Sequence, residues 1–181
     1  MTSKRNAELE AARILKELKL DKKLPIDIEQ AASALNVVVK YEPFDEDLSG
    51  VLVKERGQVV IGVNAAHVVA RQRFTVAHEL GHFVLKHAGE VFVDKTLRHE
   101  AIVIRRDGKS SLGVHSDEVE ANQFAAELLM PRKLISEQVS KRLAKKVHIT
   151  PQEIVADLAS VFKVSTQAME IRLTNLGYLT S

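Results

Sequence analysis

The chain has 181 residues, a length that predicts one compact domain with room for a small helical appendage. Its 45% hydrophobic and 28% charged residues are typical of a folded globular protein, and the net charge of +2 excludes a role that depends on strong charge over the whole molecule. There is no cysteine, so a metal ion would need histidine nitrogen or carboxylate oxygen as ligands. The first twenty residues lack the apolar core of a signal peptide, and no run approaches a membrane span, so we expect a cytoplasmic protein.

Two helices are predicted at the start of the chain. Within residues 6–20, apolar side chains recur near the helical period, which indicates an amphipathic helix. Pro25 precedes a second helical pattern over about 27–35, and the β-branched run 37–39 then favours a strand.

A small antiparallel sheet is predicted next. Residues 48–55 (LSGVLVKE) and 58–64 (QVVIGVN) are rich in β-branched side chains, and Arg56 and Gly57 separate them in the layout of a hairpin. An exposed strand edge can bind an extended peptide by adding it to the sheet, and 58–64 is our candidate for such an edge. Most edges of small sheets bind nothing, so this interpretation competes with a purely structural one.

The motif HExxH, formed by His78, Glu79 and His82, lies in a helix predicted over about 65–87. Residues four apart lie about 40° from each other around a helix, so the two imidazoles can converge on one ion. Glu79 points to the neighbouring part of that face, where it is a candidate general base. Each of these residues alone is more simply a surface side chain, but the set on an apolar helix favours a metal centre. Gly81 predicts close packing by another element, because a mid-helix glycine costs about 1 kcal/mol relative to alanine.

A catalytic metal site needs a third protein ligand, and a second helix is predicted to supply it. The stretch SDEVEANQFAAELLMP places Ser116 or Asp117 as a cap at the helix start, followed by a buried apolar stripe that ends at Pro131.

Two glutamates on this helix compete for the ligand role. Glu118 and Glu120 face about 200° from one another, so only one can look at the metal. We choose Glu118, because it shares a face with Asn122, which can hydrogen-bond a ligating histidine from behind. Glu120 is then expected to be solvated.

Two stretches, RQRFTVAHELGH (71–82) and EVEANQFAAELLMP (118–131), resemble the signature pair of the ImmA/IrrE family of bacterial metallopeptidases. The similarity covers about 24–179. The resemblance implies a gluzincin-like zinc site whose ligands and general base map onto His78, Glu79, His82 and Glu118. With the predicted elements it gives an α+β fold: a mainly helical metallopeptidase domain with a small antiparallel sheet and an active-site helix, followed by a C-terminal helical part.

The resemblance also implies a function. Members of that family are peptidases of narrow specificity that cleave a helix-turn-helix transcriptional repressor and so derepress stress or mobile-element genes. Zn²⁺ is the expected cofactor, although a site of two histidines and one glutamate also suits manganese or iron. Glu79 would take a proton from the attacking water and later deliver it to the leaving amine.

Other residues near the motifs have open roles. Four side chains are candidates for stabilising the oxyanion, and the sequence does not rank them: Arg71, Arg73, His115 and Tyr178. The remaining histidines are expected on the surface: His67, His87, His99 and His148. The long connection 89–116 between the motifs predicts either a mobile flap over the substrate channel or a disordered insertion.

After Pro131 the chain changes character, and we place a boundary between a metallopeptidase core, 1–131, and a C-terminal helical part, 132–181. The second part holds eight Lys or Arg and four Asp or Glu, a mild basic excess. Residues 149–179 predict two helices around a break at 163–165, with Ser165 or Thr166 capping the second, which is the layout of a helix-turn-helix.

This layout supports a rival function, a DNA-binding transcriptional regulator. Such a module would bring four side chains of its second helix near bases or phosphates: Thr166, Gln167, Glu170 and Arg172. Two packed helices with a tight turn are also common structural units, and they can dock a repressor substrate or pack under the zinc site. A third hypothesis is an interaction protein that uses zinc structurally.

Overall fold

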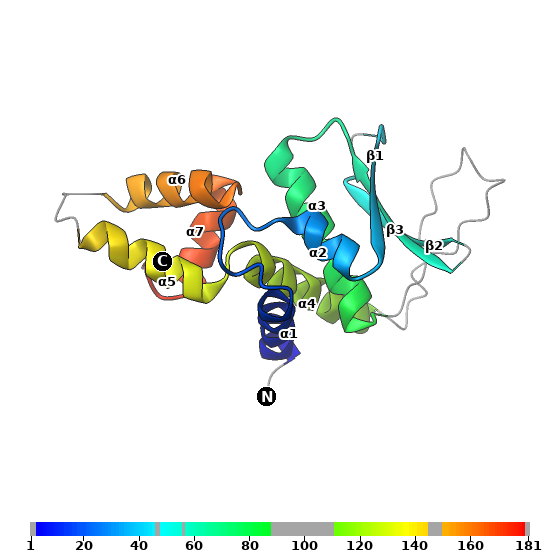
Figure 1. Cartoon of the computed structure of the whole chain (residues 1–181), viewed down its shortest axis with the longest axis horizontal. Helices are drawn as coiled ribbons and strands as arrows, with labels where there is room; N and C mark the ends of the chain where they lie inside the picture. The colour runs from blue at the N-terminus through cyan, green and yellow to red at the C-terminus, as the bar shows by residue number, and fades with distance from the viewer. Residues whose placement is uncertain (1–2, 46–47, 56, 88–110, 145–149, 180–181) are drawn as a thin grey trace.

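The computed structural model describes residues 3–45, 48–55, 57–87, 111–144 and 150–179. These residues form seven helices and one three-stranded sheet, so the predicted α+β class is confirmed. Figure 1 shows the sheet near one end of the long axis of the molecule and the C-terminal helices at the other end. None of the helices in the described ranges is long and apolar enough to cross a membrane.

The first two helices form where the apolar spacing predicts them. α1 spans Ser3–Glu17 and α2 spans Ile28–Ala34. Asp27 caps α2, since its Oδ1 atom accepts a hydrogen bond from the Gln30 N–H at 2.9 Å. One face of α1 is buried in the core through Ala7, Ala11, Ile14 and Leu15.

The sheet is mixed, whereas the sequence predicts an antiparallel one. β1 (Val37–Glu42), β2 (Gly50–Glu55) and β3 (Gln58–Asn64) are arranged in the order β1-β3-β2. β2 and β3 form the predicted antiparallel hairpin, but β1 runs parallel to β3. The chain reverses once between β1 and β2 and again in the hairpin, so β3 runs in the same direction as β1. The connection after β1 is long enough to place β2 on the side of β3 away from β1.

β3 is therefore the central strand, and the prediction that it offers a free edge to a substrate is wrong. Ile61 pairs with Val39 of β1 on one side and with Leu52 of β2 on the other. Ile61 and Val63 are fully buried. The unbroken apolar run of β3 is the signal of a strand covered on both sides, and it outweighs the hairpin pattern as an indicator of position.

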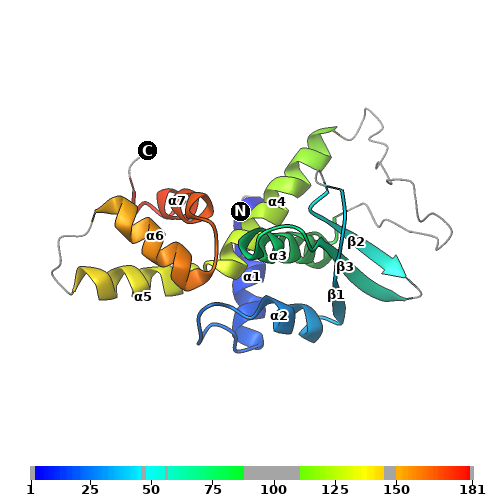
Figure 2. The ribbon, with the colours of Figure 1, turned by 90° about the horizontal axis from the view of Figure 1, so that it is seen from above.

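Two long helices carry both sequence motifs and pack along each other. They are α3 (Val69–Leu85) and α4 (Ser111–Leu129). A Cβ atom on Gly81 of α3 would lie 3.1 Å from the Cα atom of Ala121 and 3.2 Å from Cδ1 of Phe124, so the close packing predicted at this glycine is confirmed. Figure 2 shows α1 and α3 meeting α4 in the middle of the molecule.

α4 begins at Ser111, ahead of both predicted caps. Ser116 and Asp117 lie inside the helix, and the Ser116 hydroxyl donates to Glu120 Oε1 at 3.3 Å instead of capping a backbone N–H. Serine and aspartate disfavour a helix interior only weakly, so a capping pattern does not by itself end a helix. The flap or insertion predicted over 89–116 lies mostly outside the described residues, and its last residues, 111–116, belong to α4.

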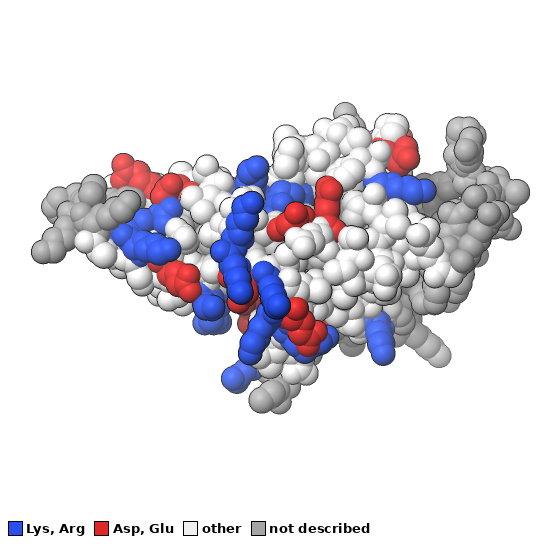
Figure 3. All heavy atoms as spheres, viewed as in Figure 1, with Lys and Arg blue, Asp and Glu red and all other residues white. Residues whose placement is uncertain are grey.

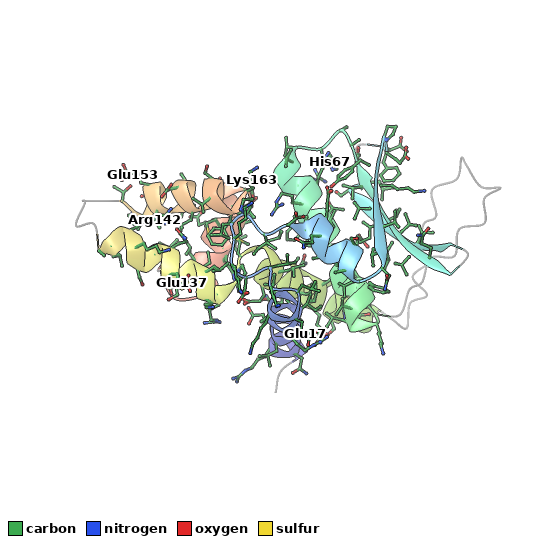
Figure 4. The ribbon with its side chains drawn as sticks, in the orientation of Figure 1. Glu17, His67, Glu137, Arg142, Glu153 and Lys163 are labelled. Atoms are coloured by element: carbon green, nitrogen blue, oxygen red, sulfur yellow. The ribbon has the colours of Figure 1, made fainter. Side chains whose placement is uncertain are left out.

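Three helices follow in the described C-terminal residues, and the first of them was not distinguished from the sequence. They are α5 (Arg132–Leu143), α6 (Pro151–Phe162) and α7 (Thr166–Asn175). The predicted break is confirmed: Lys163 is left-handed, with φ of 52°, and Ser165 Oγ accepts from the Ala168 N–H at 3.1 Å to cap α7. Figure 4 marks Arg142 between α5 and α6, where its Nε atom donates to Asp157 at 2.5 Å.

Arg172 on α7 is buried, contrary to the expectation that it faces DNA. Its side chain is 2% exposed, and its Nη1 atom donates to Glu8 Oε1 at 2.7 Å. Nε donates to the Met130 carbonyl oxygen at 3.2 Å, and Nη2 bonds the carboxylate of Glu127. A buried charge needs such partners, and here they tie α7 to α1 and α4. The boundary at residue 131 stays a prediction.

Candidate metal centre

α3 brings the two histidines of the HExxH motif together. His78 and His82 lie one turn apart, and their Nε2 atoms are 3.0 Å from each other. Their side chains are 16% and 18% exposed, so both rings are largely sheltered from solvent. The helix itself is anchored in the core by three fully buried side chains: Val76, Ala77 and Leu80.

α4 adds a carboxylate to this pair. Glu118 Oε2 lies 3.3 Å from His78 Nε2, and Glu118 Oε1 lies 3.5 Å from His82 Nε2. A tetrahedral ion with ligands at about 2.0–2.2 Å separates its donor atoms by roughly 3.3–3.6 Å. The two nitrogen–oxygen separations fall in this range, and the two Nε2 atoms, 3.0 Å apart, need to separate only slightly for the three groups to hold a single divalent ion. The Glu118 side chain is 43% exposed, which leaves the site open on this side.

Both imidazoles are held neutral by their surroundings. Burial, and then the charge of the neighbouring His78, lowers the pKa of His82 to about 4. Burial also lowers the pKa of His78, against the opposing effect of Glu118. A neutral imidazole keeps one nitrogen lone pair free, which is the form that ligates a metal.

Glu79 is a half-buried carboxyl on the same helix as the two histidines. Burial, and then the charge of Glu118, raises the pKa of Glu79 to about 7. A carboxyl with a pKa near neutrality exchanges a proton readily in either direction, which is the property of a general base that later acts as an acid.

Asn122 contacts the ring nitrogen of His78 that does not face Glu118. Its Oδ1 atom lies 3.1 Å from His78 Nδ1, one turn along α4 from Glu118. When the asparagine oxygen accepts the Nδ1–H of His78, the Nε2 lone pair of His78 faces Glu118 and His82.

His87 and Glu120 lie elsewhere than the sequence predicts. The His87 side chain is 8% exposed instead of lying on the surface, and its Nδ1 atom is 3.0 Å from His82 Nδ1. The Glu120 side chain is 20% exposed instead of solvated, and its Oε2 atom is 3.6 Å from His87 Nε2. Helical spacing correctly places Glu118 and Glu120 on different faces of α4. It does not reveal that the turn after α3 brings His87 against both His82 and Glu120. The only signal in the sequence is a third histidine soon after HExxH.

Two of the four oxyanion candidates bond to groups outside the trio of His78, His82 and Glu118. Arg71 Nη2 donates to Ser49 Oγ at 2.7 Å, and Arg73 Nη2 donates to the Ile26 carbonyl oxygen at 2.9 Å. Tyr178 is 41% exposed and follows α7. The side chain of His115 lies outside the described residues, as do His99 and His148. Among the described residues, no hydrogen bond or ion pair joins Arg71, Arg73 or Tyr178 to His78, His82 or Glu118.

Comparison with known protein families places most of the chain in one of them. A family model, Peptidase_M78, described as an IrrE N-terminal-like domain, matches residues 32–174, which include α3, α4 and most of the C-terminal helices. No curated protein matches the chain.

Proposed function

This chain belongs to the Peptidase_M78 family and is a metallopeptidase, and we propose that it is a zinc-dependent endopeptidase of narrow specificity that cleaves a helix-turn-helix transcriptional repressor. The observation that carries the proposal is the convergence of two Nε2 atoms and one carboxylate within 3.0–3.5 Å of each other. The resemblance of both motifs to ImmA/IrrE proteins supports the repressor as substrate. Its cleavage would relieve repression of stress or mobile-element genes, and such a substrate predicts a cytoplasmic location.

Three groups would hold the ion: Nε2 of His78, Nε2 of His82 and the carboxylate of Glu118. A bound Zn²⁺ would supply a Lewis acid that acidifies water and polarises the scissile carbonyl. The absence of cysteine and the mixed nitrogen and oxygen donors fit zinc and also fit Mn²⁺.

Glu79 would act first as the general base and then as the general acid of hydrolysis. Its carboxylate accepts a proton from the attacking water as the new C–O bond forms, and passes that proton to the leaving nitrogen as the C–N bond breaks. A pKa of about 7 in the metal-free site supports this double role. Asn122 would fix the His78 ring by accepting its Nδ1–H.

The structure offers less support for a DNA-binding regulator. Of the four side chains expected to reach DNA, Arg172 is buried among acids, while Thr166, Gln167 and Glu170 are exposed. On the face drawn in Figure 3, acidic and basic side chains alternate over the C-terminal helices. Duplex binding requires a continuous basic surface, so we assign these helices to packing and to docking the repressor.

Metal binding is the first test. Zn²⁺ is titrated calorimetrically into the chelator-stripped chain, beside Glu118→Ala and the control Glu137→Ala. Figure 4 shows Glu137 on α5, away from α3 and α4. We expect about one equivalent of tight binding in the wild type and the control, and much weaker binding in Glu118→Ala. Chelation should lower stability modestly; outright unfolding would favour a structural zinc instead.

Cleavage is the second test. A candidate helix-turn-helix repressor is incubated with zinc-loaded wild type and with Glu79→Gln. We expect the variant to keep its metal and lose cleavage. A variant that cleaves at the wild-type rate would remove Glu79 from the mechanism. Metal binding without cleavage of the repressor by the wild type would overturn the substrate and leave the metallopeptidase centre intact.

A further inference from the structure

His87 lies just after α3 and folds back against the metal centre. α3 ends at Leu85, Lys86 takes a left-handed conformation with φ of 55°, and the His87 N–H donates to the His82 carbonyl oxygen at 3.1 Å. This turn buries the His87 ring and sets it edge-on to the His82 ring, with an interplanar angle of 77°. The contact is made through Nδ1 of His82, whereas Nε2 of His82 faces His78 and Glu118.

Counting protons assigns the direction of this contact. A neutral imidazole carries one N–H, so a His82 ring that ligates an ion through Nε2 must carry its proton on Nδ1. That N–H points at His87 Nδ1, 3.0 Å away, which must therefore accept. The single proton of His87 is then on Nε2. This atom is buried and has no hydrogen-bond partner among the described residues, but it faces Glu120 Oε2 at 3.6 Å.

We propose that His87 is a positioning residue of the metal centre: it accepts the Nδ1–H of His82 and so holds the tautomer and the ring orientation that direct His82 Nε2 at the ion. Glu120 supports His87 in turn, because its carboxylate faces the Nε2–H. The arrangement matches the one on the other side, where Asn122 stands behind His78. Partners behind ligating histidines commonly fix the tautomer and strengthen the ligand.

A second ion at the same place is the main competing interpretation. His87, Asp117 and Glu120 bring potential ligand atoms within 4.8 Å of one another. To ligate through Nε2, however, a neutral His87 would need its proton on Nδ1, where it would meet the Nδ1–H of His82 at a nitrogen separation of 3.0 Å. Two donors cannot share that contact, so the cluster supports one ion and does not hold another.

The inference rests on the proposed metal centre, and variants of His87 test it apart from catalysis. His87→Phe keeps a ring and removes the acceptor; His87→Asn places an amide oxygen near the position of Nδ1. Zinc affinity is measured on the full chain by competition with a chromophoric chelator, and the visible absorption of the cobalt form reports coordination geometry. His67→Phe is the control, since Figure 4 shows His67 beside the start of α3, away from α4.

We expect His87→Phe to weaken zinc binding about 10- to 100-fold and to change the cobalt spectrum, with His87→Asn recovering most of the affinity and His67→Phe unchanged. Wild-type affinity and spectrum in His87→Phe would overturn the inference and leave the metal centre standing. Two equivalents of zinc in the wild type, falling to one in His87→Phe, would establish the second ion instead. A wild type that binds no zinc would overturn both proposals.

A second pair of variants tests the inference independently, in case His87→Phe does not fold. Glu120→Ala removes the carboxylate behind His87 and also the hydrogen bond from Ser116, whereas Ser116→Ala removes the hydrogen bond alone. We expect weaker zinc binding in Glu120→Ala and wild-type binding in Ser116→Ala. Equal affinity in the two variants would contradict the role given to Glu120 and His87.

Discussion

The Cα atom of Ala121 on α4 lies 3.1 Å from the point where a Cβ on Gly81 of α3 would stand. That spacing lets the two helices approach closely enough to bring Glu118 to His78 and His82. In Gly81→Ala we expect the helices to be pushed apart and the free energy of unfolding to fall by about 1–3 kcal/mol, despite a gain of about 1 kcal/mol in helix propensity. Zinc binding should weaken as well.

Urea unfolding of the zinc-free protein measures the effect of Gly81→Ala, and a zinc titration measures its effect on the site. Ser160→Ala, at an exposed position of α6, is the control for helix propensity alone. A Gly81→Ala protein that gains stability as the control does, with unchanged zinc affinity, would show that the helices do not depend on this contact.

Local pattern carried most of the fold prediction. Apolar spacing located α1, α2 and α3, and the hairpin of β2 and β3 followed from β-branched runs around Gly57. Pairing between strands distant in sequence was not predictable in this way, because nothing local to β1 determines whether it joins β2 or β3. The start of α4 was missed because Ser116 and Asp117 form a capping pattern in a place where the helix continues.

The stability of the metal-free protein should depend on pH through Glu79. Its pKa is raised to about 7 in the folded state, from 4.5 for an ordinary glutamate. Between these values the unfolded chain has lost the proton that the folded protein keeps, so the free energy of unfolding falls as pH rises and levels off above about pH 7. We expect the stability advantage of Glu79→Gln over wild type to grow over this range to roughly 2–3 kcal/mol.

Urea unfolding with a chelator present, at a series of pH values, gives this difference directly. His78 and His82 titrate in both proteins, so their contributions cancel in the comparison. A difference that is constant from pH 4.5 to 7 would mean that Glu79 titrates normally in the folded state.

Removing the oxygen behind His78 should weaken metal binding. In Asn122→Leu the Nδ1–H of His78 loses its acceptor, and we expect zinc affinity to drop about 10-fold or more. Asn122→Asp keeps an acceptor at this place and should bind zinc much more tightly than Asn122→Leu. The neighbouring Gln123→Ala is the control, and equal affinities in all three variants would rule out the role of Asn122.

The buried charge cluster should contribute strongly to stability. Arg172→Met leaves Glu127 buried without its main partner, and we expect a loss of about 3–5 kcal/mol in the free energy of unfolding. Arg172→Met combined with Glu127→Met removes both charges and should recover part of that loss. Arg142→Met breaks a pair with the half-exposed Asp157 and should cost about 1 kcal/mol or less. Denaturant unfolding compares the three.

The full chain should not bind duplex DNA in the manner of a helix-turn-helix regulator. Fluorescence anisotropy with a labelled duplex, between 50 and 200 mM salt, measures this. We expect no tight binding, because Arg172 is turned inward and cannot reach a phosphate. Tight binding that weakens steeply with salt, and is lost in Gln167→Ala, would restore the regulator hypothesis.

As with the fold, the parts of the candidate site that lie on regular helices were predictable from the sequence, and the part on a turn was not. Helical spacing alone placed His78, Glu79 and His82 on one stretch of α3, and it separated Glu118 from Glu120 on α4. The contribution of the turn after α3 escaped prediction, since a single left-handed residue, Lys86, sends His87 back toward His82. The spacing of residues predicts which side chains share a face of a helix. It does not predict the path of the backbone after the helix has ended.

The bond between Arg172 and Glu8 joins residues 164 positions apart, so it closes only when nearly all of the chain between them has been made. During synthesis, Glu127 on α4 has no contact with Arg172 until α7 has emerged from the ribosome. A chain interrupted between α4 and α7 would therefore carry both metal-site motifs, with the buried carboxylate of Glu127 lacking its cationic partner. Products truncated in this interval should therefore be poorly folded, because a buried charge without its partner is strongly destabilising.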